Sequence, residues 1–172
     1  MNFTITIENS KTNKTEDFYL DEFFELQDLV ELVMEELETE DENDLILVEI
    51  DVPEFIKRLL LINTEKEKVT EALQEDIFEI INEAIDTGFD EEVFDAFIEI
   101  DYTNEPFKFM EAINEAYYGE FESDEEFAEQ FYEELGEINH MGHLANYIDW
   151  EAVAYDLMFD YTEEDGHYFR NI

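Results

Sequence analysis

The sequence has no cysteine, two prolines, five glycines and only eight lysine and arginine residues among 172. Without cysteine there are no disulfides, thiol catalysis or cysteine-ligated metals. So few cations exclude binding to nucleic acid through its phosphates and docking on an anionic membrane, because both need clustered Lys and Arg. No run approaches 18 apolar residues, so we expect no membrane-spanning helix. The start lacks a basic segment followed by an apolar one, which favours a cytoplasmic protein over a secreted one.

What the sequence has in excess is negative charge. Asp and Glu number 51, and the formal net charge is -43. Disordered acidic chains are poor in bulky apolar residues, with roughly 20% or less of Leu, Ile, Val and Phe. Here these four make up about 31% of the chain, so we expect a folded core surrounded by carboxylates. Three explanations for such a surface are open: a halophile's solvation shell, a cation buffer, or an imitation of a polyanion.

The spacing of apolar residues predicts an α+β fold with three small domains. The N-terminal domain, residues 1–63, is predicted to be mixed, because its apolar residues alternate in some segments and recur every three to four positions in another. Its predicted elements are strands over 2–8, 18–20 and 45–50 and a helix over 21–38. A break with a helix cap is expected at Asn63-Thr64.

A helical middle domain is predicted over residues 64–103, and a mixed α/β C-terminal domain over 104–172. The middle domain is expected to contain helices around 65–73, 75–86 and 90–99. In the C-terminal domain, Ser123 and Glu126 form a capping box that starts a helix, and Gly136 ends that helix. Further predicted elements are a helical turn at 141–147, a helix over 150–158 capped by Asp149, and a hairpin at Asp165-Gly166.

Signals for catalysis or metal binding are weak. Paired carboxylates perform glycoside hydrolysis, but with 51 acidic residues close pairs arise by chance. An acidic hydrolase would need a pocket holding a carboxyl group with a raised pKa. His140 and His143 have a spacing that chelates metals on a helix, but Gly142 lies between them and the sequence fixes no third ligand. We therefore expect no enzyme, no metal and no cofactor.

The spacing of the carboxylates favours imitation of DNA. DNA carries one charge per roughly 1.7 Å of axis, so 43 net charges correspond to about 70 Å of duplex. Side chains four apart on a helix lie about 6 Å from each other, close to the separation of neighbouring phosphates. Lys108 is the only cation from residue 69 to residue 169, so the usual supporting Lys–Glu pairs are missing. The carboxylates predicted to imitate phosphates are Asp90, Glu91, Asp95, Glu99, Glu120, Glu122, Asp124, Glu125, Glu126, Glu129, Glu133, Glu134 and Glu137.

A series of residues between 117 and 170 resembles a known family. It includes the segments 118–128, 134–136 and 147–152, continues with Ala154 and Asp156-Leu157, and ends with Asp165-Gly-His, Phe169 and Arg170. In this order and spacing they resemble the ArdA antirestriction proteins of plasmids, transposons and phages. The aromatic members are expected in the core and the glycines at turns, so the motif identifies a fold more than a chemical site. Its fold-defining residues are Tyr118, Gly119, Ser123, Gly136, Asp149, Trp150, Asp165 and Gly166.

The resemblance implies an elongated, curved homodimer of small domains that imitates bent DNA in the cytoplasm of a host bacterium. It implies binding to the methyltransferase core of type I restriction–modification enzymes, blocking restriction and sometimes modification. Residues 9–20 depart from the family pattern, because they contain neither the glycines nor the tryptophan expected there. Two alternatives stay open: a DNA mimic directed at another defence system such as a CRISPR effector, and an acidic chaperone or buffer for basic proteins.

Overall fold

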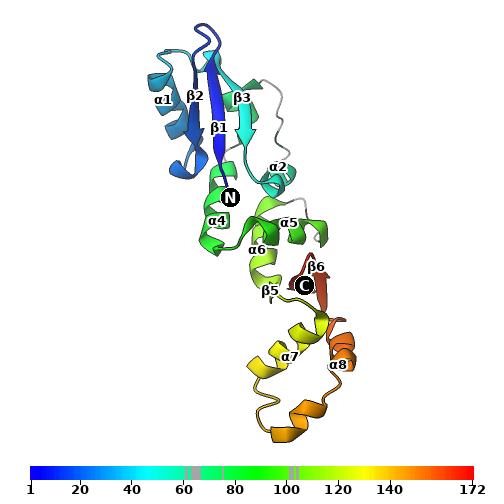
Figure 1. Ribbon diagram of the computed structural model, residues 1–172. Helices are drawn as coiled ribbons and strands as arrows, with labels where there is room; N and C mark the ends of the chain where they lie inside the picture. Colours follow the sequence, from blue (N-terminus) through cyan, green and yellow to red (C-terminus); the bar gives the residue numbers. More distant parts are fainter. Residues whose placement is uncertain (61, 63–66, 75, 101–102, 104) are drawn as a thin grey trace. The chain divides into compact units, whose positions relative to one another are not determined.

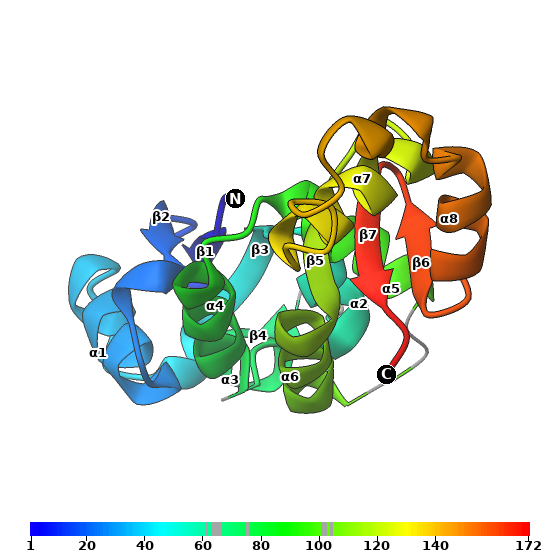
Figure 2. The same ribbon diagram turned by 90° about the horizontal axis from the view of Figure 1, so that it is seen from below.

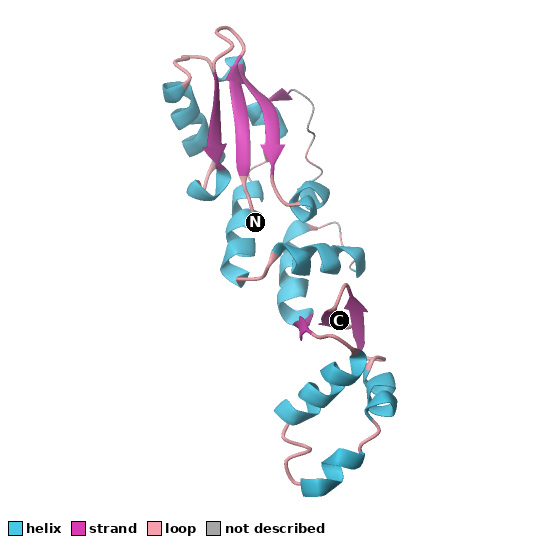
Figure 3. Ribbon diagram, in the orientation of Figure 1, coloured by secondary structure: helices cyan, strands magenta, loops and turns pink. Residues whose placement is uncertain are grey.

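The computed structural model has an α+β fold with two small antiparallel sheets and several helices (Figures 1 and 3). It describes residues 1–60, 62, 67–74, 76–100, 103 and 105–172. The chain separates into two compact units: unit 1 comprises Met1–Asp95 and Thr103–Met110, and unit 2 comprises Ala96–Tyr102 and Glu111–Ile172. The division into three domains at residues 63 and 103 stays a prediction.

Unit 1 contains a sheet in the order β2-β1-β3-β4, with β1 in the middle of its long strands. Apolar residues face one side because the side chains of a strand alternate. Ile5 of β1 pairs with Phe18 of β2 and with Ile50 of β3, and all three are buried. The strands are β1 (Thr4–Asn9), β2 (Thr15–Tyr19), β3 (Leu45–Asp51) and β4 (Glu67–Lys68).

The helices of unit 1 bury apolar stripes at helical spacing. Helix α1 buries Leu29, Val30 and Val33, and α4 packs against α2 and the 3-10 turn η1. Phe55 of α2 stacks on Phe94 of α5 with ring centroids 4.4 Å apart. Helices α5 and α6 each contribute residues to both units. The elements are η1 (Leu20–Glu22), α1 (Leu26–Glu36), η2 (Glu42–Asp44), α2 (Glu54–Leu60), α3 (Val69–Ala72), α4 (Asp76–Thr87), α5 (Glu91–Ile100) and α6 (Pro106–Ala116).

Unit 2 contains a second sheet in which β5, β7 and β6 lie side by side in that order (Figure 2). Helices α7 and α8 pack against each other, and η3 lies between them in the chain. The core of the unit contains Phe127, Ala128, Ala154, Leu157 and Tyr168. The remaining elements are β5 (Tyr117–Glu120), α7 (Asp124–Glu134), η3 (Gly142–Tyr147), α8 (Trp150–Leu157), β6 (Tyr161–Glu164) and β7 (His167–Arg170).

Most fold-defining residues of unit 2 have the predicted structural roles, but Gly119 lies within strand β5, at a register shift against β7, and not at a turn. Ser123 Oγ accepts a hydrogen bond from the Glu126 N–H at 3.2 Å, and Asp149 caps α8. Gly136 ends α7 with a φ of +77°, where its N–H bonds to the Glu133 carbonyl. Asp165 and Gly166, with φ of +50° and +84°, form the β6–β7 hairpin turn. Tyr118, Phe121 and Trp150 are half-buried against the core.

Several predicted boundaries are wrong. The second strand begins at Thr15, because its polar residues pair with β1. The first helix begins at Leu26 rather than 21, because residues 20–22 form η1 and Phe23 is extended. Within the described residues 67–73, the helix predicted over 65–73 comprises only Val69–Ala72, because residues 67–68 pair with β3. Helix α6 was not predicted, and the expected break at Asn63-Thr64 lies outside the described residues.

The left-handed turn at Gly136 gives a test of the fold. Replacing Gly136 with Ala should lower the free energy of unfolding by about 1 kcal/mol, because a Cβ disfavours positive φ. The added Cβ has room, with its nearest neighbour, Asn139 Nδ2, 3.5 Å away. The control is Gly136→Asn, which should lose less because Asn tolerates this conformation. Urea unfolding measures both, and equal losses would contradict this account of the turn.

Candidate functional site: the carboxylate surface of unit 2

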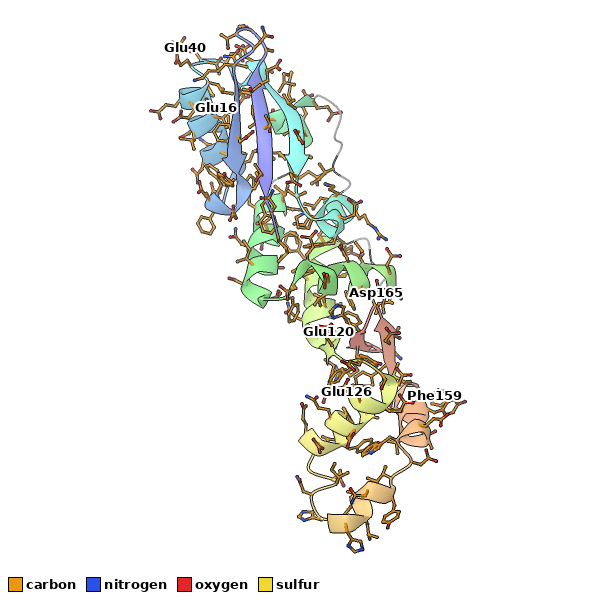
Figure 4. The ribbon with its side chains drawn as sticks, in the orientation of Figure 1. Glu16, Glu40, Glu120, Glu126, Phe159 and Asp165 are labelled. Carbon is orange, nitrogen blue, oxygen red and sulfur yellow. The ribbon has the colours of Figure 1, made fainter. Side chains whose placement is uncertain are left out.

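Ten of the thirteen carboxylates predicted to imitate phosphates belong to unit 2, and all ten are exposed. Figure 4 shows two of them, Glu120 on β5 and Glu126 on α7. The other three belong to unit 1, where Asp90 is exposed and Glu91 and Asp95 are half-buried. In unit 2, most of the carboxylates predicted to imitate phosphates therefore lie between the start of β5 and the end of α7.

Helix α7 presents one side to the core and the other to solvent. Phe127 and Ala128 are fully buried, whereas Glu126, Glu129 and Glu133 are exposed. Steps of three and four residues place these glutamates on one face. They span about 10 Å at 1.5 Å per residue. The predicted continuation through Glu122 and Glu137 is exposed but lies beyond the two ends of the helix.

Two tyrosines hold carboxylates at opposite ends of α7. The Tyr118 hydroxyl of β5 donates to Glu134 Oε2 at 2.7 Å, and the Tyr168 hydroxyl of β7 donates to Asp124 Oδ1 at 2.7 Å. Gln130 also donates, to Glu134 Oε1 at 3.1 Å. The sequence predicts Tyr118 in the core but does not predict these hydrogen bonds. The two bonded pairs, Tyr118 with Glu134 and Tyr168 with Asp124, are 16 and 44 residues apart in the chain.

These hydrogen bonds fix the charge states of the groups. The bonds from Tyr118 and Gln130 lower the pKa of the Glu134 carboxyl. Burial, followed by the bond to Glu134 and its charge, raises the pKa of Tyr118. Burial and the bond to Asp124 raise the pKa of Tyr168 in the same way. Glu134 is therefore ionised and both hydroxyls are protonated donors at neutral pH.

The carboxylates of unit 2 have almost no counter-charges. Its residues include 20 Asp and Glu but a single cation, Arg170. The ion pairs of unit 1 use its cations locally, as Lys11 does with Asp44 at 2.6 Å. The other described pairs, Lys57–Glu54, Lys68–Glu71 and Lys108–Glu105, also lie in unit 1. Both units therefore carry a large excess of negative charge, but unit 2 has a single cation to offset its carboxylates.

Chemical alternatives find little support in the described residues. Within that part of the chain, no three His, Cys, Asp or Glu side chains are grouped to hold a metal. His140 and His143 are both exposed, and His167 is buried 3.2 Å from the Tyr117 hydroxyl. Burial and the charge of Glu79 raise the pKa of Glu83, but Glu83 lines none of the three hollows described in that part of the chain. None of the helices described is long and apolar enough to cross a bilayer.

The tyrosine–carboxylate pairing predicts a shift in an alkaline titration. Replacing Glu134 with Gln should lower the pKa of Tyr118, because the phenolate would no longer face a carboxylate. NMR of ¹³C-labelled tyrosine from about pH 8 to about pH 12 measures it. Glu133→Gln is the matched control, because Glu133 is the exposed neighbour on the same helix. Equal shifts of Tyr118 in both variants would contradict the pairing.

Burial of Tyr118, together with its bond to Glu134, makes stability depend on pH. The pKa of Tyr118 is raised in the folded protein, so its contribution is complete below the ordinary value of 10.0. That contribution declines as the pH rises above 10.0 toward the folded pKa. In Tyr118→Phe, this part of the alkaline loss of unfolding free energy should disappear.

Comparisons with known proteins find one relationship. No curated protein and no solved structure matches the chain. Residues 89–169 match the family described as antirestriction protein (ArdA), which confirms the resemblance seen in residues 117–170 and extends it through α5 and α6. The matched segment includes α7, its carboxylates and the two tyrosine bonds, whereas residues 1–88 lie outside it. The part of this chain from residue 89 to residue 169 is therefore similar to the ArdA antirestriction proteins.

Proposed function

We propose that this protein is an antirestriction protein that imitates DNA and occupies the DNA-binding groove of a type I restriction–modification enzyme. The family match over residues 89–169 supports the antirestriction function. The uncompensated carboxylate surface of unit 2 supports the mechanism, and it is the observation that carries this proposal. The protein acts without catalysis of its own, in the cytoplasm of a host bacterium where these enzymes meet DNA.

The physical basis is competition for the same cations. A groove that binds DNA presents Lys and Arg at phosphate spacing, and most of its affinity comes from releasing the ions condensed around the charges. The exposed glutamates of α7 offer oxygen acceptors at about 6 Å steps on a rigid helix. Because α7 contains no Lys or Arg, none of these carboxylates is neutralised from within the helix. The proposed partner is the methyltransferase core of the enzyme.

A displacement assay tests this function. The protein is titrated into a purified type I methyltransferase core carrying its cognate duplex, at two salt concentrations. We expect release of DNA at near-stoichiometric protein, weakening as salt rises. A histone-like protein is the control target, because an acidic chaperone would bind it equally well. Equal binding to both targets, or displacement indifferent to salt, would contradict DNA mimicry of this enzyme.

Charge variants show whether the surface acts as a whole. Exposed carboxylates contribute little individually, so Glu125→Gln, Glu129→Gln and Glu133→Gln should each change displacement by less than about threefold. The triple variant should weaken displacement more strongly and reduce its salt dependence. A variant of Glu16, Glu31 and Glu40 in unit 1 removes the same charge and serves as the control. Equal losses in both triple variants would show that only net charge matters.

We further propose that the protein is a homodimer through unit 2. Four apolar residues of one chain segment there, called the apolar patch, are exposed to solvent: Leu135, Met141, Leu144 and Tyr147. Met141 also lines a hollow of about 290 Å³, together with Tyr132, Glu137, Ile138, Ile148, Trp150 and Val153. Exposed apolar side chains gathered in one segment are typical of an interface with another protein. Self-association buries them without requiring a second kind of partner.

Sedimentation of a charged variant tests the dimer. Leu144→Glu should give a monomer, because Leu144 is 56% exposed in the apolar patch and a carboxylate there would face its own copy. Phe24→Glu is the matched control, because Phe24 is 77% exposed but belongs to unit 1. A dimer that survives Leu144→Glu, or dissociates equally with Phe24→Glu, would place the interface elsewhere.

A further inference from the structure

We propose that Tyr118 and Tyr168 are positioning residues, which hold Glu134 and Asp124 in place so that these two carboxylates bind cations of the partner better than freely moving ones. This inference rests on the proposed function and refines it. Instead of many equivalent charges, the surface would have two fixed points at the ends of α7, with Glu129 and Glu133 between them, whose carboxylates have no hydrogen bond in the described part of the chain.

The tyrosine rings are themselves packed against other rings of the core. Tyr168 is 2% exposed, and its ring centroid lies 4.5 Å from that of Phe127 at the centre of the core. Tyr118 packs edge-on against Phe127 at 5.2 Å and against Tyr161 at 5.9 Å. A ring packed on several sides holds its hydroxyl at a defined position. The carboxylate bonded to that hydroxyl is therefore held in place relative to the core.

The two carboxylates keep acceptor capacity for a partner. Each carboxylate has about four lone-pair sites. Glu134 uses one site for the Tyr118 hydroxyl and one for the Gln130 amide. Both Glu134 and Asp124 are exposed to solvent. Ten residues of helix separate Asp124 from Glu134, which is about 15 Å along the axis. A DNA strand advances that distance in four to five nucleotides at about 3.4 Å each.

Fixing a carboxylate in advance removes an entropic loss on binding. A free glutamate must give up its rotamer freedom when it pairs with a cation, whereas Glu134 has already done so. Glu129 and Glu133 have no hydrogen bond to their carboxylates in the described part of the chain and must be ordered by the partner. Glu134 and Asp124 should therefore contribute more per charge than their neighbours do.

The experiment compares hydroxyl-deleted variants in the displacement assay. Tyr118→Phe and Tyr168→Phe keep the rings and the net charge, and each should weaken displacement by about 2- to 10-fold. The matched control is Tyr161→Phe, because Tyr161 lies in the same aromatic cluster and its hydroxyl has no partner among the described residues. Tyr161→Phe should displace DNA as the unchanged protein does. Thermal unfolding of each variant confirms that the compared proteins are folded.

A double-mutant cycle separates positioning from a general structural effect. In a Glu134→Gln background, Tyr118→Phe should have no further effect on displacement, because there is no longer a charge to position. The salt dependence should stay unchanged in Tyr118→Phe and become shallower in Glu134→Gln, since only the second removes a charge. If Tyr118→Phe weakens displacement as much in the Glu134→Gln background as in the unchanged protein, the positioning role is overturned.

A second pair of variants avoids the core entirely. Glu134→Gln and Glu133→Gln remove the same charge from neighbouring residues, and Glu134→Gln should weaken displacement several-fold more. Equal effects would overturn the inference even if a phenylalanine variant did not fold. Failure of the unchanged protein to displace DNA would overturn the proposed function itself, whereas displacement insensitive to Tyr118 and Tyr168 would overturn only the positioning role.

Discussion

Repulsion between like charges is the constraint that the rest of unit 2 must overcome. Twenty carboxylic side chains and one arginine belong to fewer than 70 residues, and repulsion of this kind favours expanded chains over compact ones. The opposing force is aromatic and aliphatic burial around Phe127, which contacts the rings of Tyr118, Phe121, Phe131, Tyr161 and Tyr168. The charged surface exists because a dense core beneath it supplies the compensating free energy.

The same core also decides where the charges lie. A core of phenylalanine alone would offer no hydrogen-bond donor to the surface carboxylates. A tyrosine buries its ring and still presents a hydroxyl donor at the edge of the core. In unit 2 two such hydroxyls reach the ends of α7. The cap at Ser123 adds a third constraint, because Glu126 Oε2 accepts the N–H of Glu122 at 2.7 Å. The residues around α7 that pack the core and cap the helix therefore also determine where its carboxylates lie.

Sequence patterns predicted the elements whose signals are local. The Ser123 cap, the Gly136 stop, the Asp149 cap and the Asp165-Gly166 turn each depend on residues within a few positions of one another. Helix α6 was missed because Pro106 and the aromatics after it look like a break, although Phe109, Met110 and Ile113 have helical spacing and are buried. The bonds from Tyr118 and Tyr168 could not be predicted, because they depend on how β5, β7 and α7 come together.

The placement of carboxylates in unit 2 narrows the choice among the explanations for the acidity. A halophile's shell or a cation buffer needs carboxylates everywhere and has no use for their exact placement. Both units have far more carboxylates than cations, so charge alone does not separate these explanations, but the hydrogen bonds of Tyr118 and Tyr168 hold carboxylates within the segment that matches the family. Hydrogen bonds that restrict an exposed carboxylate are of little value to a solvation shell, because they limit its hydration. They are useful where a cation of a partner must find that carboxylate at a given position, and this favours recognition over solvation.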